Sequence, residues 1–170
     1  MAERTVTLHG NALDLAGTAV GAGEQAPDVE LLDNGLKPVA LSSLRGKTLV
    51  ILSVPSLDTP VCDVETRRFN QEAAGLGDDV AVVAVSMDLP FAQARWCGAA
   101  EIENVQTLSD HREGAFGEAF GVLIPALRLL ARAVFVVDAE GVVQYAQVVP
   151  EVADEPDYGA ALDAVRALTS

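Results

Sequence analysis

The stretch SVPSLDTPVCDVETRRFNQ (Ser53–Gln71) contains Cys62, one of only two cysteines in the chain, at the start of a predicted helix. Thr59 suits an N-cap and Pro60 suits the first helical position, so Cys62 falls in the first turn. Unpaired backbone N–H groups and the helix dipole favour an anion there. The local geometry therefore predicts a thiol with a lowered pKa that acts as a nucleophile. The alternative is that Cys62 is a small core side chain.

The remaining candidates carry weaker signals. Cys97, in FAQARWCGAA, could take part in chemistry or could pack a helix end beside Trp96. His111, in SDHREG, could partner a cysteine in a hydrolase, but no orienting group surrounds it, which favours a solvated loop position. The histidines His9 and His111 are isolated and the cysteines are far apart, a spacing unlike that of zinc sites, so we expect no metal.

Composition limits the classes of protein to consider. The 170 residues fit one domain, residues 1–170, and a net charge of −14 argues against nucleic-acid and anionic-membrane partners. No apolar run approaches the roughly 20 residues that cross a bilayer, and the first residues lack a signal-peptide pattern. We therefore expect a cytoplasmic protein, in which a static structural disulfide is disfavoured.

The hydrophobic pattern predicts an α/β fold. Continuous aliphatic runs, typical of strands that are covered on both faces, occupy Thr48–Val54, Val80–Met87 and Ala133–Asp138. Helices are predicted at Val61–Ala74, Pro90–Ala100 and Arg112–Phe120, and a last amphipathic helix follows Pro156. The resulting architecture is a mixed α/β sandwich with helices on both faces of a sheet.

Turn signals add three hairpins and a short helical turn. The hairpins are VTLHGNALDLAG around Gly10-Asn11, VELLDNGLKPVAL around Asn34-Gly35, and DAEG (Asp138–Gly141) leading into VVQYAQVV. LSSLRGK reads as a helical turn that ends at Gly46.

Several of these segments together resemble a known family. PSLDTPVC fits the Pro-X-X-X-Thr-X-X-Cys signature of peroxiredoxins, and DTPVCDVETRRFNQ, SMDLPFAQARWCGA and LLARAVFVVD resemble its thiol peroxidase subfamily. The resemblance covers essentially the whole chain. It implies a thioredoxin-like fold with a mixed central sheet and an N-terminal hairpin extension, residues 1–20. It also implies reduction of hydrogen peroxide and of alkyl or lipid hydroperoxides without a cofactor.

The resemblance also implies roles for individual residues. Cys62 is then the peroxidatic cysteine, Thr59 and Pro55 belong to the peroxide pocket, and Arg132 lies beside the thiolate. Cys97 is the resolving cysteine of an atypical two-cysteine enzyme. An intramolecular Cys62–Cys97 disulfide, reduced by a thioredoxin-like protein, and a homodimer follow from the same resemblance.

Other interpretations stay open. Thr59 could be only a cap, and Arg132 could be a surface arginine, although the apolar residues around it disfavour that. A redox sensor or holdase could use the same reversible disulfide without turnover. A disulfide oxidoreductase is disfavoured, because Thr59 occupies the place of the first cysteine of a Cys-X-X-Cys motif.

Overall fold

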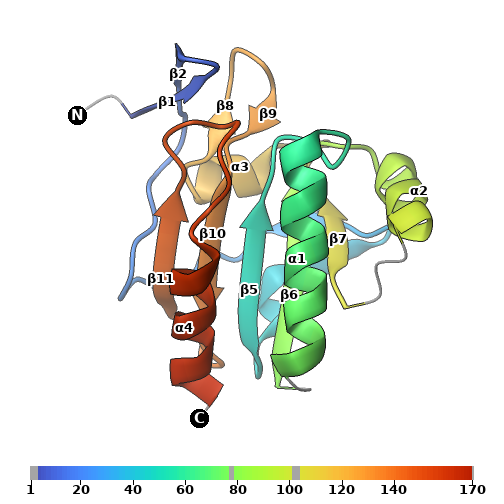
Figure 1. Cartoon of the computed structure of the whole chain (residues 1–170), viewed down its shortest axis with the longest axis vertical. Helices are drawn as coiled ribbons and strands as arrows, with labels where there is room; N and C mark the ends of the chain where they lie inside the picture. Colours follow the sequence, from blue (N-terminus) through green and yellow to red (C-terminus); the bar gives the residue numbers. More distant parts are fainter. Residues whose placement is uncertain (1–3, 77–78, 101–103, 170) are drawn as a thin grey trace.

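The computed structural model describes residues 4–76, 79–100 and 104–169. Its central sheet contains β3 (Glu30–Leu32), β4 (Pro38–Ala40), β5 (Thr48–Ser53), β6 (Val80–Ser86), β7 (Gln106–Ser109), β10 (Ala133–Val137) and β11 (Val143–Val148). These seven strands lie in the order β11-β10-β5-β6-β7-β3-β4 (Figure 1). The strands β5, β6 and β7 are parallel, whereas the other pairings are antiparallel. The predicted mixed sheet is confirmed.

Helices cover both faces of this sheet. The helices α1 (Pro60–Leu76) and α4 (Tyr158–Thr169) lie on one face, and the short α3 (Ala115–Ala119) lies on the other (Figure 1). Along β5, Val50 and Leu52 pack towards α1 and α4, whereas Leu49 and Ile51 pack towards the opposite cluster. This alternation explains why the strand is a continuous apolar run. The helix α2 (Pro90–Ala100) packs beside β7.

The N-terminal hairpin is confirmed, with a small correction to its turn. It pairs β1 (Thr5–Leu8) with β2 (Asn11–Asp14). The turn residues are His9 and Gly10, both at positive φ, and not Gly10-Asn11. In the β3–β4 hairpin the residue at positive φ is Leu36, because the Asp33 carboxylate accepts the N–H groups of Gly35 and Lys37 and shapes a longer turn.

The short elements were the ones that the hydrophobic pattern missed. The strand β7 and the hairpin of β8 (Leu123–Ile124) with β9 (Leu129–Leu130) were not predicted. The predicted helix at Arg112–Phe120 is only Ala115–Ala119 in the structure. The Asp110 carboxylate accepts the N–H groups of Phe116 and Gly117 and so fixes where that helix begins. The helical turn η1 (Leu41–Leu44) is confirmed.

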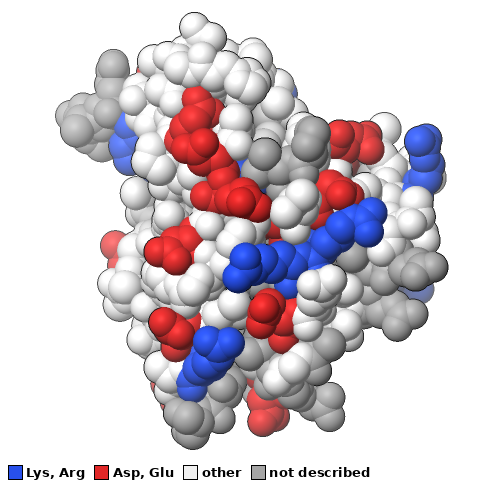
Figure 2. Space-filling view, in the orientation of Figure 1, with Lys and Arg blue, Asp and Glu red and all other residues white. Residues whose placement is uncertain are grey.

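The surface carries charges of both signs. On the face that bears α1 and α4, basic side chains are bordered by acidic ones, with no broad basic area (Figure 2). Within the described residues, no helix is both long and apolar enough to cross a bilayer.

Candidate active site

Cys62 is the third residue of α1, which follows the carboxyl end of β5. Its side chain is 0% exposed and packs in a small cluster with Val54 and Leu57. The loop before the helix is held by Asp88, whose carboxylate accepts Ser56 Oγ at 2.7 Å and the Leu57 N–H at 2.8 Å. Because Asp88 lies two residues after the end of β6, the two parallel strands jointly position the thiol.

Thr59 occupies the residue before α1, as expected, but its hydroxyl is used differently from a cap. Its carbonyl accepts the Asp63 N–H at 3.0 Å, the first bond of the helix. The hydroxyl donates to the Ser56 carbonyl at 2.8 Å, and the Thr59 side chain also hydrogen-bonds the Cys62 thiol. A hydroxyl has one proton, so Thr59 has to turn away from the Ser56 carbonyl before it can donate to the reacting sulfur.

Arg132 is buried, with 1% of its surface exposed, so the surface interpretation is wrong. Its Nε donates to the Val152 carbonyl at 2.9 Å, and its Nη1 donates to Glu65 Oε2 at 2.5 Å. The guanidinium also hydrogen-bonds the Cys62 thiol. Arg132 therefore joins the thiol to a carboxylate that lies on the same helix as the thiol.

Glu65 is a site residue that the sequence analysis missed. It is fully buried, and among the described residues its Oε1 has no hydrogen-bond partner. Burial raises its pKa to about 7, although the charge of Arg132 acts in the opposite direction. The available signal was its spacing, because a residue three positions after Cys62 lies on the same side of a helix.

The predicted lowering of the Cys62 pKa is contradicted for this closed arrangement. Burial raises the pKa of the thiol, and this effect exceeds the lowering caused by the Arg132 charge and by the hydrogen bonds from Thr59 and Arg132. Sequence spacing indicated the helix start correctly, but it could not reveal that the sulfur is fully enclosed.

A cavity of about 340 Å³ lies beside the thiol and is lined in part by its two neighbours Thr59 and Arg132. Its lining is mainly apolar and comes from five parts of the chain: the first hairpin, the loop before α1, the β8–β9 hairpin, Arg132 directly before β10, and the segment after β11. The lining residues are Leu8, His9, Pro55, Thr59, Ile124, Leu127, Leu129, Arg132, Val152 and Ala153. The structure thus brings Pro55, Thr59 and Arg132 to one pocket.

Cys97 is not part of that pocket. It lies on α2, half-buried, with its Sγ 3.5 Å from Thr107 Oγ1 on β7. It lines a separate cavity of about 260 Å³, together with Asn34 and Thr107. Both cysteines are free thiols in this structure. A disulfide between Cys62 and Cys97 therefore needs a change in conformation.

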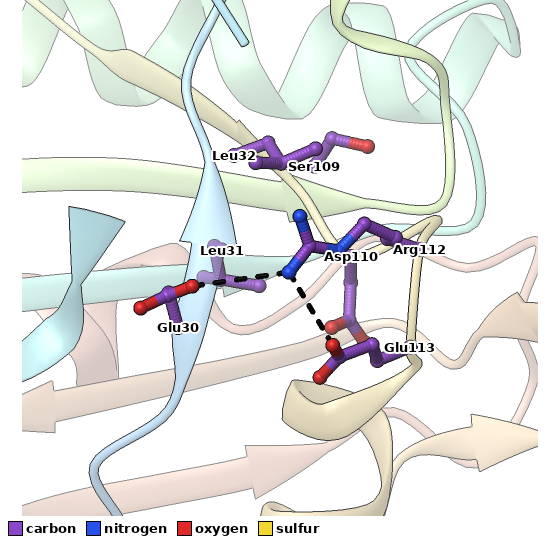
Figure 3. A pocket seen from close by; sticks show the side chains of 7 residues that line it. All are labelled: Glu30, Leu31, Leu32, Ser109, Asp110, Arg112 and Glu113. Atoms are coloured by element: carbon purple, nitrogen blue, oxygen red, sulfur yellow. Dashed lines mark hydrogen bonds and ion pairs between the residues drawn. The ribbon is translucent and has the colours of Figure 1, made fainter. Parts of the chain in front are cut away.

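His111 follows β7 in a turn that shapes another cleft. Figure 3 shows its neighbours there: Arg112 points between Glu30 and Glu113, with N–O distances of 3.9 and 3.4 Å. Asp110 turns to the start of α3, where its carboxylate accepts two N–H groups. These charged groups already interact with one another, which agrees with a structural turn.

Comparisons with known proteins agree with this geometry. The sequence profile of the family described as Redoxin matches residues 21–162. The thiol peroxidase of Bacillus subtilis (strain 168) is 54% identical over 163 residues, which cover 96% of this chain and 97% of that protein. The thiol peroxidase of Staphylococcus aureus (strain MRSA252) is 49% identical over 161 residues, covering 95% and 97%.

Solved structures have the same fold. A peroxiredoxin-like protein from Aquifex aeolicus superposes with a TM-score of 0.91 at 45% identity, covering 97% of each chain. The thiol peroxidase from Chromobacterium violaceum superposes at 0.86 with 22% identity, covering 96% of this chain and 95% of that one, a likeness of fold alone. On the family profile and the two bacterial relatives together, this chain belongs to the Redoxin family, among its thiol peroxidases.

Proposed function

We propose that this enzyme reduces hydroperoxides with Cys62 as the peroxidatic cysteine. The observation that carries the proposal is the contact of one buried thiol with both Thr59 and Arg132 beneath an apolar pocket. The Cys62 thiolate attacks the terminal oxygen of the hydroperoxide and the O–O bond breaks. The sulfur becomes a sulfenic acid, and the other oxygen leaves, once protonated, as water or an alcohol.

Arg132 and Thr59 act on this step through their hydrogen bonds. A guanidinium offers several fixed donors, and a hydroxyl can both donate and accept. Donors aimed at the oxygen that gains charge stabilise the transition state beyond their effect on the thiol pKa. Glu65 holds Arg132 in place through the 2.5 Å bond.

The second thiol completes the proposed cycle. Cys97 condenses with the sulfenic acid, forming the Cys62–Cys97 disulfide and releasing water. A thioredoxin-like dithiol protein then restores both thiols by two exchange reactions and is itself oxidised to a disulfide. No metal or organic cofactor takes part in these steps.

The pocket supports organic hydroperoxides as substrates in addition to hydrogen peroxide. A cavity of about 340 Å³ lined by Leu8, Ile124 and Leu129 accommodates an alkyl group, which hydrogen peroxide does not need. Relatives that are named thiol peroxidase favour this enzymatic function over a redox sensor or holdase, since a peroxidase turns over.

The homodimer is also a proposal. Leu89 and Phe91, next to and within the start of α2, are 52% and 66% exposed, as expected for apolar side chains that a second copy covers. Sedimentation of the native chain and of a Phe91→Glu variant tests it: the native chain should be dimeric and the variant monomeric, whereas a monomeric native chain contradicts the proposal.

The decisive experiment is peroxidase turnover coupled to NADPH through thioredoxin and thioredoxin reductase. Cys62→Ser should abolish turnover while the circular dichroism spectrum stays native, because the change is nearly isosteric. Cys97→Ser, the matched control, should still consume about one equivalent of hydroperoxide before it stops. Substantial turnover by a folded Cys62→Ser variant would refute the assignment.

A further inference from the structure

Asp63 and Trp96 connect the two helices that carry the cysteines. Trp96 Nε1 donates to Asp63 Oδ1 at 2.9 Å, and the other Asp63 oxygen accepts Arg67 Nε, also at 2.9 Å. Asp63 comes directly after Cys62 on α1, and Trp96 comes directly before Cys97 on α2. Each partner of this hydrogen bond is therefore covalently next to one of the two thiols.

The Trp96 ring faces α1. Besides its bond to Asp63, it packs against the cluster formed by Val54, Leu57 and Cys62. Trp96 thus covers the surroundings of the peroxidatic thiol from the side of α2.

Cys97 faces a different direction. Consecutive residues of a helix are rotated by about 100° from each other, so the residue after Trp96 cannot share its direction. The observed contacts agree: Cys97 Sγ lies 3.5 Å from Thr107 Oγ1, which itself donates to Asn34 Oδ1 at 2.9 Å. Since the Thr107 hydroxyl has one proton and uses it on Asn34, the Cys97 thiol is the donor in its contact with Thr107.

We propose that the Asp63–Trp96 hydrogen bond is a latch that sets the rate of disulfide formation, and that Asp63 and Trp96 are positioning residues for the resolving thiol. While Trp96 points at α1, Cys97 is held towards β7. A disulfide requires Cα atoms within about 7 Å and Cβ atoms near 4 Å. To bring Cys97 to Cys62, α2 has to turn or unwind, which breaks the latch.

The latch acts at a branch point of the chemistry. This inference rests on the proposed roles of Cys62 and Cys97. The sulfenic acid on Cys62 either loses water with the Cys97 thiol to form the disulfide, or reacts with a second hydroperoxide. In the second case sulfur gains another oxygen, becoming a sulfinic acid, and the hydroperoxide leaves as alcohol or water. A slowly opening latch favours the sulfinic acid.

Trp96 supplies a direct readout, because it is the only tryptophan of the chain. In the native enzyme mixed with one equivalent of hydrogen peroxide, its emission should change with the rate constant of disulfide formation, measured in parallel by acid quench and mass spectrometry. An emission change that is complete with sulfenic acid formation, before any disulfide appears, contradicts the latch.

Variants then test whether the bond controls the rate. Trp96→Phe keeps a ring but lacks the donor, and Asp63→Ala lacks the acceptor while Trp96 stays in place. Each should form the disulfide about tenfold faster, equivalent to about 1.4 kcal/mol, and should accumulate less sulfinic acid. The rate of the first reaction with peroxide should stay within about twofold. Arg95→Gln, which changes an exposed side chain of the same helix outside the proposed dimer contact, is the matched control and should behave like the native chain.

The double variant separates a specific bond from general loosening of α2. If the two residues act through one bond, Asp63→Ala with Trp96→Phe should be no faster than the faster single variant. If the two accelerations of disulfide formation multiply in the double variant, the latch is refuted while the proposed function stands. The same holds if both single variants form the disulfide at the native rate. A native chain that forms no Cys62–Cys97 disulfide at all overturns the proposed roles, and the latch with them.

Discussion

At the scale of single residues, Glu65 connects the site to the stability of the fold. Its folded pKa, raised to about 7 from 4.5, means that the folded protein keeps a proton which the unfolded chain has already lost. The contribution of Glu65 to the free energy of unfolding is therefore most favourable below about pH 4.5, and it falls as the pH rises towards 7. For a group this deeply buried the full loss is about 3 kcal/mol.

Glu65→Gln should remove this dependence. Urea unfolding at about pH 5 and pH 7.5 measures it: the native chain should lose more stability between the two values than the variant does. Asp110 and Cys62 also have raised pKa values, but they are present in both proteins and cancel in the comparison. Equal losses in the two proteins would mean that Glu65 is ionised throughout this range.

Arg132 offers a second prediction at the same scale, because its two effects on Cys62 can be separated by pH. It lowers the thiol pKa against the effect of burial, and it can donate to the departing oxygen. In Arg132→Met the rate constant for peroxide reduction should stay about 100-fold lower even at the high-pH plateau, where the thiol is fully ionised. If both proteins reach the same plateau, Arg132 acts on the pKa alone. Arg132→Lys, which keeps the charge without the fork of donors, is the matched comparison.

At the scale of elements, the sequence of α2 makes this helix easy to unwind. Gly98 follows Cys97 within the helix, is exposed, and has open space where a Cβ would lie. Glycine costs a helix about 1 kcal/mol relative to alanine. Gly98→Ala should therefore stabilise α2 and slow disulfide formation about fivefold.

Two measurements check this prediction. Amide hydrogen exchange of the reduced protein should slow across Pro90–Ala100 and stay unchanged in β6, and rapid-quench kinetics should report the slower disulfide. Disulfide formation at the native rate despite slower exchange would mean that α2 rotates without unwinding. A second glycine-to-alanine change, Gly10→Ala, is unsuitable as a control for Gly98→Ala. Gly10 has a φ of 83°, a conformation that alanine adopts only with strain.

At the scale of the whole molecule, Glu151 ties the N-terminal hairpin to the segment after β11. Its carboxylate accepts the N–H groups of Gly10 and Ala153 and the Thr7 hydroxyl, at 2.8–3.1 Å. These bonds lower the pKa of Glu151 to about 2. Because the folded pKa lies below 4.5, the tie is intact above that pH and is lost as the pH falls towards 2.

The hairpin tie should influence substrate choice, since Leu8 and His9 of this hairpin line the pocket. Glu151→Ala should raise the KM for a bulky hydroperoxide such as cumene hydroperoxide several-fold. The rate constant with hydrogen peroxide should not change, because that substrate needs no apolar wall. Steady-state kinetics with both substrates decides it, and equal effects on the two would assign Glu151 a purely structural role.

Much of this protein follows from local sequence. The runs Thr48–Val54 and Val80–Met87 predicted β5 and β6, and the prediction that a helix begins at Pro90 matched the start of α2, because periodicity and proline act within a few residues. The start of α1 after Thr59 was also predicted from neighbouring residues alone. Short elements such as β7 and β8–β9 were missed, since two to four residues carry too little pattern.

Tertiary structure alone decided the electrostatics of the site. The Arg132–Glu65 pair joins residues 67 positions apart, and Trp96 reaches Asp63 across 33 positions. No pattern of neighbours encodes such pairs, because they exist only once β10, α1 and α2 pack together. The same packing removes water from Cys62, so desolvation outweighs the helix start that the sequence indicated, and the thiol pKa rises where local geometry predicted a fall.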